Sequence, residues 1–286
     1  MKELIVISGK GGTGKTSVTA SFAVLAGGAV LCDCDVDASD LPLVLAPEIR
    51  EDHDFYSGRE ARIEADLCTS CGVCADLCRF DAVRMGQGGV FTIDPLSCEG
   101  CGVCVRFCPA AAVTFTERYC GKWFVSETRC GPLVHARLGI GAENSGKLVS
   151  LVRREARRLA GERGIDRVVC DGPPGIGCPV IASLTGATAA LVVTEPTVSG
   201  VHDLDRVLAL TAHFRIPAYV AVNKWDLNPG MTEAVEEEAV KAGAIVLGRI
   251  RYDGGVTRAQ LARKAVVETD APCAEDILKL WENLDF

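Results

Sequence analysis

The segment SGKGGTGKTS, residues 8–17, follows a short apolar run at 4–7 and leads into a helical stretch at 17–25. This order of strand, glycine loop and helix, with the pattern G-x4-G-K-T, is typical of loops whose backbone amides surround phosphate oxygens. In such loops the lysine, here Lys15, reaches the β- and γ-phosphates, and the hydroxyl of the next residue, Thr16, binds Mg²⁺. The sequence therefore predicts a nucleotide site formed by Gly11, Gly12, Thr13, Gly14, Lys15, Thr16 and Ser17.

Acidic residues follow two further apolar runs. The run at 29–32 continues into DCDVDASD, and the run at 167–170 ends in DGPPGIGC. Because the carboxyl ends of parallel strands face the phosphate crevice, carboxylates there can hold Mg²⁺ through water or orient the attacking water. Asp171 fits the first of these roles. The candidates after the earlier run are Asp33, Asp35, Asp37 and Asp40.

The rest of the chain alternates between two kinds of segment. Apolar runs lie at 189–193, 219–222 and 244–247, and helical stretches at 202–213, 231–242 and 256–265. This alternation predicts an α/β fold with a doubly wound, mainly parallel sheet. A further helix is expected at 147–163, where Arg153, Arg154, Arg157 and Arg158 lie opposite the apolar residues and predict a solvated face.

Eight of the 15 cysteines form two copies of one pattern, C-x2-C-x2-C-x3-C, in CTSCGVCADLC at 68–78 and CEGCGVCVRFCP at 98–109. At this spacing three thiolates of one run hold a [4Fe-4S] cube, and the fourth crosses to the other cluster. Two [4Fe-4S] clusters are therefore predicted, one on Cys68, Cys71, Cys74 and Cys108, the other on Cys98, Cys101, Cys104 and Cys78. Paired zinc knuckles are the alternative, but they do not usually close each run with a fourth cysteine. One departure is Arg79, where the second run has Pro109.

The two cysteine runs begin 30 residues apart, and a short β-prone stretch, AVRM or AVTF, follows each. This repeat is expected of a duplicated ferredoxin half. We expect an inserted α+β ferredoxin domain of the bacterial type at 63–119, between the two parts of the nucleotide-binding domain at 1–62 and 120–286. The flanking segments 48–63 and 120–146 are expected to form hinges or covering strands.

Composition narrows the choice of partners and compartment. The chain has 286 residues, of which 48% are hydrophobic and 24% charged, and its formal charge is −8. Such a composition is ordinary for a globular protein, and the negative charge disfavours nucleic acid. No apolar run reaches the roughly 18 residues that span a bilayer. The opening MKELIVISGKGG has no export signal, so reduced thiols and a cytoplasmic location are expected.

The string KGGTGKT resembles the deviant Walker A loop of the MinD and ParA ATPases, and the whole chain resembles MinD-superfamily P-loop ATPases that contain an inserted ferredoxin domain. The matching segments cover most of the chain: SGKGGTGKTS, CDCDVDASDL, both cysteine runs, GAENSGKLV, DGPPGIGCPVIASL and VTEPTVSGVHDL. The resemblance implies Mg²⁺-dependent ATP hydrolysis and an ATP-dependent homodimer, in which Lys10 crosses to the partner's phosphates. It also implies that Asp35, the second Asp of D-x-D, acts with Lys15 and Asp171 in catalysis.

The NKWD string at 223–226 bears on the choice of base. It matches the guanine-reading N-K-x-D of GTPases, whereas the Asn at this position faces adenine in the MinD class. The resemblance therefore assigns Asn223 to the base and favours ATP. GTP stays open because Asp226 is also present.

Two functions stay open at this stage. The first is ATP-gated electron transfer to a redox partner protein, and the second is metal-cluster assembly or transport, as in the related Mrp class. Cys178 follows Asp171 by seven residues, much as a cluster-ligating cysteine does in the nitrogenase iron protein, and Cys120 or Cys130 could complete such an additional site. The C-x-x-C of the Mrp class is missing near the C-terminus, where only Cys273 lies, and this weakens the second function.

Overall fold

The computed structural model describes residues 1–139, 141–142 and 146–286, which form two compact units. The first unit contains Met1–His53, Lys122–Leu138 and the described residues from 146 onwards, and the second contains Asp54–Gly121 with the described part of 139–143. The chain enters the second unit within strand β3 (Glu48–Ile63) and leaves it within β6 (Val113–Thr128). The insert expected at 63–119 lies inside this second unit.

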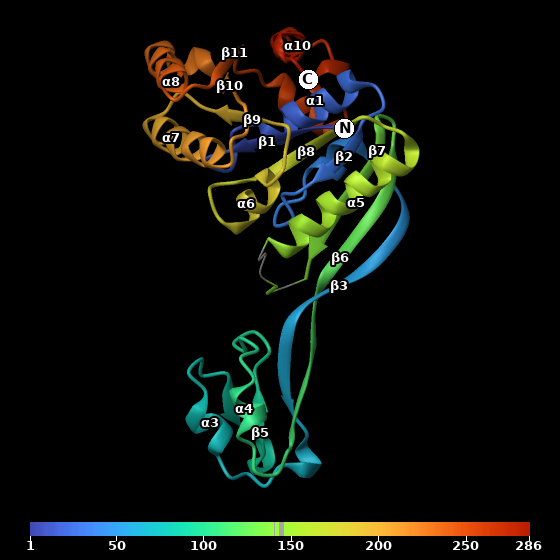
Figure 1. The fold of residues 1–286 in the computed structure, drawn as a ribbon, viewed down its shortest axis with the longest axis vertical. Helices are drawn as coiled ribbons and strands as arrows, with labels where there is room; N and C mark the ends of the chain where they lie inside the picture. The colour runs from blue at the N-terminus through green and yellow to red at the C-terminus, as the bar shows by residue number, and fades with distance from the viewer. Residues whose placement is uncertain (140, 143–145) are drawn as a thin grey trace. The chain divides into compact units, whose positions relative to one another are not determined.

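The first unit is built on a sheet in the order β11-β10-β9-β1-β8-β2-β7-β6-β3 (Figure 1). Besides β3 and β6, its strands are β1 (Lys2–Ser8), β2 (Val30–Asp33), β7 (Gly131–Leu138), β8 (Arg167–Pro174), β9 (Ala189–Thr194), β10 (Ala218–Asn223) and β11 (Ile245–Ile250). The pairings from β11 to β7 are parallel. Central strands such as β9 are buried along their whole length, as parallel strands covered on both faces must be.

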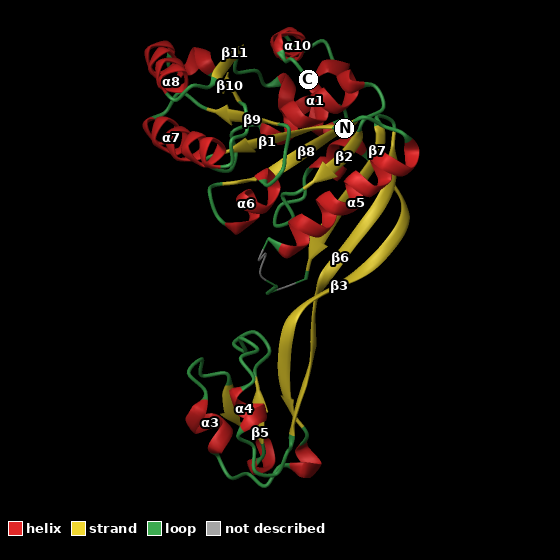
Figure 2. Cartoon of the chain, in the orientation of Figure 1, coloured by secondary structure: helices red, strands yellow, loops and turns green. Residues whose placement is uncertain are grey.

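Helices cover both faces of this sheet (Figure 2). One face carries α1 (Lys15–Ala26), α2 (Leu41–Leu45), α9 (Gly255–Leu261) and α10 (Cys273–Asn283). The other carries α5 (Lys147–Arg163), α6 (Cys178–Leu184), α7 (Val198–His213) and α8 (Pro229–Lys241). The predicted α/β fold with a mainly parallel sheet is confirmed.

Two local predictions need adjustment. The helix expected over 256–265 ends at Leu261, because Arg263 adopts a left-handed backbone conformation with φ of 54°. The flanks of the cysteine-rich segment form strands, since 48–63 is β3 and 120–146 supplies the end of β6 and all of β7. These strands extend one edge of the sheet.

The prediction of a solvated arginine face on α5 is wrong for Arg153. Its side chain is only 4% exposed and pairs with Glu3, which is 2% exposed. The guanidinium donates to Glu3 Oε1 at 2.9 Å and to the carbonyls of Ala182 and Thr185 at 2.7 and 2.9 Å. Arg157 donates to Glu3 Oε2, also at 2.9 Å. Helical spacing alone missed this pair, because an acidic residue on β1 faces α5 from a distant part of the sequence.

Replacement of Arg153 by Met is expected to lower the free energy of unfolding of the first unit by about 3 kcal/mol, since one partner of a buried ion pair is removed. All three tryptophans, Trp123, Trp225 and Trp281, belong to this unit, so the tryptophan fluorescence during urea unfolding reports on it. Arg154→Met, at a 69% exposed side chain of the same helix, is the matched control and should change stability by no more than about 0.5 kcal/mol. Equal stability of the two variants would contradict the assignment.

The second unit is small and has little apolar core. It contains α3 (Val73–Leu77), α4 (Val103–Arg106) and an antiparallel pair of short strands, β4 (Val83–Met85) and β5 (Phe91–Ile93). The buried apolar cluster at its centre consists of Ala61, Ala82, Cys98 and Val113. A unit of this size usually needs disulfides, metals or a partner to be stable.

No described helix is both long enough and apolar enough to cross a bilayer. The amphipathic C-terminal helix α10 instead directs Ile277 and Leu280 into the core of the first unit.

Candidate functional site

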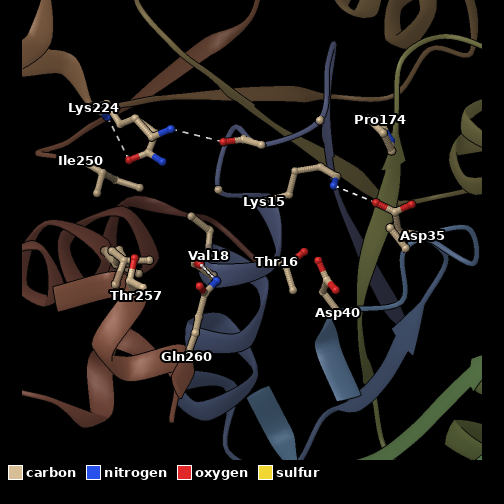
Figure 3. Close-up of a pocket in the computed structure, with 18 of the residues that line it drawn as sticks. Lys15, Thr16, Val18, Asp35, Asp40, Pro174, Lys224, Ile250, Thr257 and Gln260 are labelled. Carbon is tan, nitrogen blue, oxygen red and sulfur yellow. Dashed lines mark hydrogen bonds and ion pairs between the residues drawn. The ribbon is translucent and has the colours of Figure 1, made fainter. Parts of the chain in front are cut away.

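The predicted phosphate loop lies between β1 and α1, at the carboxyl end of the sheet. It borders a cavity of about 560 Å³. The loop residues Gly11, Gly12, Gly14, Lys15, Thr16 and Ser17 line it, together with residues from other segments that include Asp35, Asn223, Tyr252, Val256 and Gln260. Figure 3 shows part of this lining. A glycine is required at position 14, because its φ is 93° and an added Cβ would lie 2.4 Å from the amide nitrogen of Asn223.

Lysine and carboxylate side chains meet beneath this loop. Lys15 Nζ lies 3.0 Å from Asp35 Oδ2, and both side chains are under 10% exposed (Figure 3). The hydroxyl of Thr16 donates to Asp171 Oδ2 at 2.6 Å, and that of Thr19 donates to Asp171 Oδ1 at 2.9 Å. The structure thus brings together three of the predicted catalytic residues. Thr19 was not among the site residues predicted from the sequence. Its position one helical turn after Thr16 could have indicated that its hydroxyl lies on the same face of the helix.

Burial shapes the charge of this group. It raises the pKa of Asp171 to about 6, against the opposing effects of Lys15 and the hydroxyls of Thr16 and Thr19. It likewise raises the pKa of Asp35, which Lys15 partly offsets. For Lys15, burial lowers the pKa, but the nearby carboxylates of Asp171 and Asp35 outweigh it and the pKa lies above its ordinary value.

The donor set fits a hydrated divalent cation. Asp33 is fully buried beside Asp35, accepting the amide N–H of Asp35 at 3.1 Å and the Ser39 hydroxyl at 2.8 Å. When ionised, Asp33, Asp35 and Asp171 carry three negative charges against the single positive charge of Lys15. Hard oxygen ligands with an excess of two negative charges suit Mg²⁺. Thr16 and Asp171 would hold the ion; Asp37 and Asp40 line the cavity without an assigned role.

The NKWD segment holds the phosphate loop from the other side. Asn223 Nδ2 donates to the carbonyl of Thr13 at 2.8 Å, and Lys224 Nζ donates to the carbonyl of Gly12 at 3.3 Å. Asp226 does not line the cavity; its carboxylate accepts the backbone N–H of Tyr252 at 2.7 Å. The carboxylate that would read guanine in N-K-x-D is therefore engaged with the backbone.

Lys10 lies at the exposed rim of the loop. Its Nζ is 3.3 Å from Glu195 Oε2 and 3.3 Å from the hydroxyls of Thr197 and Ser199, and the side chain is 33% exposed. Glu195 also forms an ion pair with Lys224. If Lys10 moves away, the carboxylate of Glu195 is not left unpaired, because its ion pair with Lys224 remains.

The two cysteine runs in the second unit share one backbone conformation. A left-handed residue stands two positions after the first cysteine, one position after the second, and three positions after the fourth. In the first run these are Ser70, Gly72 and Asp81, and in the second Gly100, Gly102 and Ala111. Each third cysteine lies on a short helix, α3 or α4, and the fourth follows it. The sequence repeat is thus also a structural repeat.

The eight cysteines of these runs surround two separate cavities. One is lined by Cys68, Cys71, Cys74 and Cys108, the other by Cys98, Cys101, Cys104 and Cys78. Each cavity thus takes three cysteines from one run and the last cysteine of the other. Backbone amides point at two of the sulfurs: Ser70 N lies 3.4 Å from Cys68 Sγ, and Ala112 N lies 3.3 Å from Cys108 Sγ. Four thiols around one space, with N–H donors to sulfur, fit a cluster that takes four thiolate ligands.

Cys178 stands apart from these groups. It is exposed at the first position of α6, whereas Cys130 is 8% exposed within the core on the α1 face of the sheet. Cys120 is buried in the second unit and donates to the carbonyl of Ser57 at 3.3 Å. An additional site on Cys178 stays a prediction. The GAENSGKLV match lies partly outside the described residues, at 143–145.

Comparisons with known proteins find similarity in sequence and in fold. The family model of the CobQ/CobB/MinD/ParA nucleotide binding domain matches residues 4–266. The uncharacterized protein MJ0578 of Methanocaldococcus jannaschii is 31% identical over 286 residues, covering 99% of this chain and 96% of its own length.

Two solved structures share the fold at low sequence identity. The cell division ATPase MinD of Pyrococcus furiosus matches with a TM-score of 0.58 and 20% identity, over 99% of this chain and 98% of its own. The septum site-determining protein MinD of Pyrococcus horikoshii, solved in complex with Mg-ADP, matches with a TM-score of 0.59 and 18% identity, over 99% and 96%.

Proposed function

The chain belongs to the CobQ/CobB/MinD/ParA nucleotide-binding family, and we propose that it binds and hydrolyses ATP with Mg²⁺ and couples its nucleotide state to electron transfer through two [4Fe-4S] clusters. The observation that carries the proposal is the sorting of eight cysteines into two four-thiol sets within a chain that also has a complete phosphate loop.

The residues of the nucleotide site support the first half of the proposal. Lys15 would neutralise charge on the β- and γ-phosphates, Thr16 and Asp171 would hold Mg²⁺, and Asp35 would orient the attacking water. When bound, Mg²⁺ supplies electrostatic stabilisation of the transferring phosphoryl group. ATP is favoured over GTP because Asp226 is bonded to the backbone of Tyr252. The MinD of P. horikoshii with Mg-ADP is a relative in fold that holds this class of ligand.

The residues of the second unit support the electron-transfer part of the proposal. When bound, two [4Fe-4S] clusters supply one-electron redox chemistry between a donor and an acceptor protein. The cysteines would bind the irons, while the N–H groups of Ser70 and Ala112 would stabilise negative charge on sulfur and so favour the reduced state. Large apolar side chains exposed on this unit would suit docking of a redox partner: Leu67, Leu77, Phe80, Leu96 and Phe107.

A homodimer that forms on ATP binding is part of the proposal. In the family that the loop resembles, the residue at the position of Lys10 contacts the partner's phosphates. Lys10 is accessible here, and Glu195 keeps Lys224 as an ion-pair partner if Lys10 moves away. Dimer formation on ATP and its loss on hydrolysis would give the two states between which the electron-transfer surfaces change.

The coupling can be tested with anaerobic full-length protein. We expect the Kd of a non-hydrolysable ATP analogue to differ at least about 5-fold between the oxidised and the dithionite-reduced chain, a typical lower value for linked sites. Linkage then requires shifts of the two cluster potentials that sum to about 40 mV when the analogue binds. Both are measured on one preparation, by fluorescence titration and by redox potentiometry.

The double variant Cys71→Ala/Cys101→Ala removes one predicted ligand from each cluster and is the control, in which the redox dependence of the Kd should vanish. An unchanged Kd together with an unchanged potential in the wild-type chain would overturn the electron-transfer proposal. It would leave cluster assembly or transport as the function, with the exposed Cys178 as its first candidate ligand.

A further inference from the structure

Three buried cysteines lie beneath the phosphate site, outside the eight cysteines of the second unit. Cys32 and Cys34 flank Asp33 at the end of β2, and Cys170 precedes Asp171 on β8. Cys32 and Cys170 are direct neighbours in the parallel pairing of these strands, and all three side chains are fully buried. Since alternate residues of a strand share a face, the three thiols lie on one side of the sheet.

The spacing of the three sulfurs suits one metal ion. Their Sγ atoms all lie within 4.8 Å of one another, and those of Cys32 and Cys34 are 3.4 Å apart. A metal–sulfur bond of about 2.3 Å places the sulfurs of a three-thiolate site about 4 Å apart. Within the described residues, no other group of three or more His, Cys, Asp or Glu side chains has this spacing. A [4Fe-4S] cube, by contrast, requires four thiolates around a larger space.

The surroundings contain two arginines that share one carboxylate. Glu3 is bonded to the buried Arg153 and to Arg157, which is 35% exposed, so these three side chains have a formal charge of +1 that is partly solvated at Arg157. Glu3 Oε1 accepts the Nε–H of Arg153 at 2.9 Å and also lies 3.6 Å from Cys170 Sγ. Arg153 Nη2 is buried and forms an ion pair with Glu3 Oε2 at 2.8 Å, without an aligned hydrogen bond. An anionic centre at the three sulfurs would balance this charge.

We propose that Cys32, Cys34 and Cys170 bind one thiophilic d10 metal ion, Zn²⁺ or Cu⁺, as a three-thiolate site. Binding forms three metal–sulfur bonds and releases the three thiol protons. With Zn²⁺ the metal site carries a charge of −1, and its sum with Glu3, Arg153 and Arg157 is zero; with Cu⁺ the sum is −1. Soft thiolate ligands favour these ions over Mg²⁺, which takes hard oxygen ligands.

The position gives the ion a structural role. It would join the ends of β2 and β8, the strands that lead into Asp35 and Asp171. It would add to the parallel pairing of these strands and to the backbone bond between Cys34 N and the carbonyl of Asp171 at 2.8 Å. This inference does not depend on the proposed electron transfer, because the site lies wholly within the first unit.

The test uses full-length protein purified anaerobically with its full complement of iron. Separate samples are exposed to Zn²⁺ alone and Cu⁺ alone, dialysed against a chelator, and analysed for zinc, copper and iron per chain. We expect about one retained ion for one of the two metals, and the two arms identify which. Cys32→Ala and Cys34→Ala should each lose it at unchanged iron content. Cys273→Ala removes an equally buried cysteine outside the site and should retain it.

X-ray absorption at the zinc or copper edge of the wild-type chain provides a second measurement that needs no variant to fold. A first shell of three sulfurs at about 2.3 Å supports the site. Less than about one tenth of an ion per chain in both arms would overturn the proposal, as would equal retention in Cys32→Ala and Cys273→Ala. A Cys32–Cys34 disulfide in the anaerobic protein would also overturn it, because the two sulfurs could not then bind as thiolates.

Discussion

Replacement of Lys15 by Ala is expected to lower the rate of ATP hydrolysis by about 10²–10³-fold, the range for loss of one preorganised electrostatic contact to a transition state. The ammonium group of Lys15 lies in the cavity wall, 6% exposed and 3.0 Å from Asp35. It interacts electrostatically with the carboxylates of Asp33, Asp35 and Asp171, so its loss would leave their charge to repel the triphosphate. Phosphate release is measured under anaerobic conditions at saturating ATP and Mg²⁺.

Two further measurements separate catalysis from folding. Lys241→Ala, at a 66% exposed side chain on α8, is the matched control and should hydrolyse ATP at the wild-type rate. Lys15→Ala removes one partner of a buried ion pair and leaves Asp35 in place. Tryptophan fluorescence should therefore first show that the variant is folded under the conditions of the hydrolysis assay. Hydrolysis by Lys15→Ala within 3-fold of the wild-type rate would contradict the role of Lys15, whatever nucleotide affinity the variant retains.

The sequence predicted the parts of the fold that depend on local pattern. The apolar runs form the parallel strands, which are mostly buried apart from the edge strand β11, and the helix at 147–163 has the predicted bounds. Contacts between distant segments were not predictable in this way. Helical spacing assigns Arg153 to a charged, solvated helix face, but in the structure its side chain is buried and pairs with Glu3 on β1. A single sequence shows which residues share a helix face. It does not show which side chains of the sheet pack against that face.

The same distinction holds for the candidate site. Lys15, Thr16, Asp35 and Asp171 converge because loops at the carboxyl ends of parallel strands meet at one edge of the sheet. The hydrogen bond from Tyr252 N–H to Asp226 depends instead on the path of the loop after β11, which brings Tyr252 beside Asp226. No local sequence pattern predicts this contact. The thiols of Cys32, Cys34 and Cys170 were missed for a related reason, since their proximity follows from the pairing of β2 with β8.

Replacement of Cys108 by Ala is expected to abolish the intact cluster of the first cysteine run and leave that of the second. Cys108 belongs to the second run in sequence, yet it lines the same cavity as Cys68, Cys71 and Cys74. The wild-type chain should contain about eight Fe, and loss of one cube lowers this to about four. Iron analysis and electron paramagnetic resonance of the reduced protein measure the loss. Cys120→Ala is the control and should keep about eight Fe, because this cysteine lines neither cavity.

Paired replacements distinguish exchange of the fourth ligand from two self-contained runs. If the ligands cross over, Cys71 and Cys108 serve one cluster, so Cys71→Ala/Cys108→Ala should still contain one intact cube and about four Fe. Cys78→Ala/Cys108→Ala then damages both clusters and should contain no intact cube. Self-contained runs require the opposite for the first pair, because Cys71 and Cys108 would serve different clusters. The effects of the two single replacements should therefore overlap in the first double variant and add in the second, as expected when only the first pair shares a site. Loss of both cubes from Cys71→Ala/Cys108→Ala would contradict the crossover and would show that each run holds its own cluster.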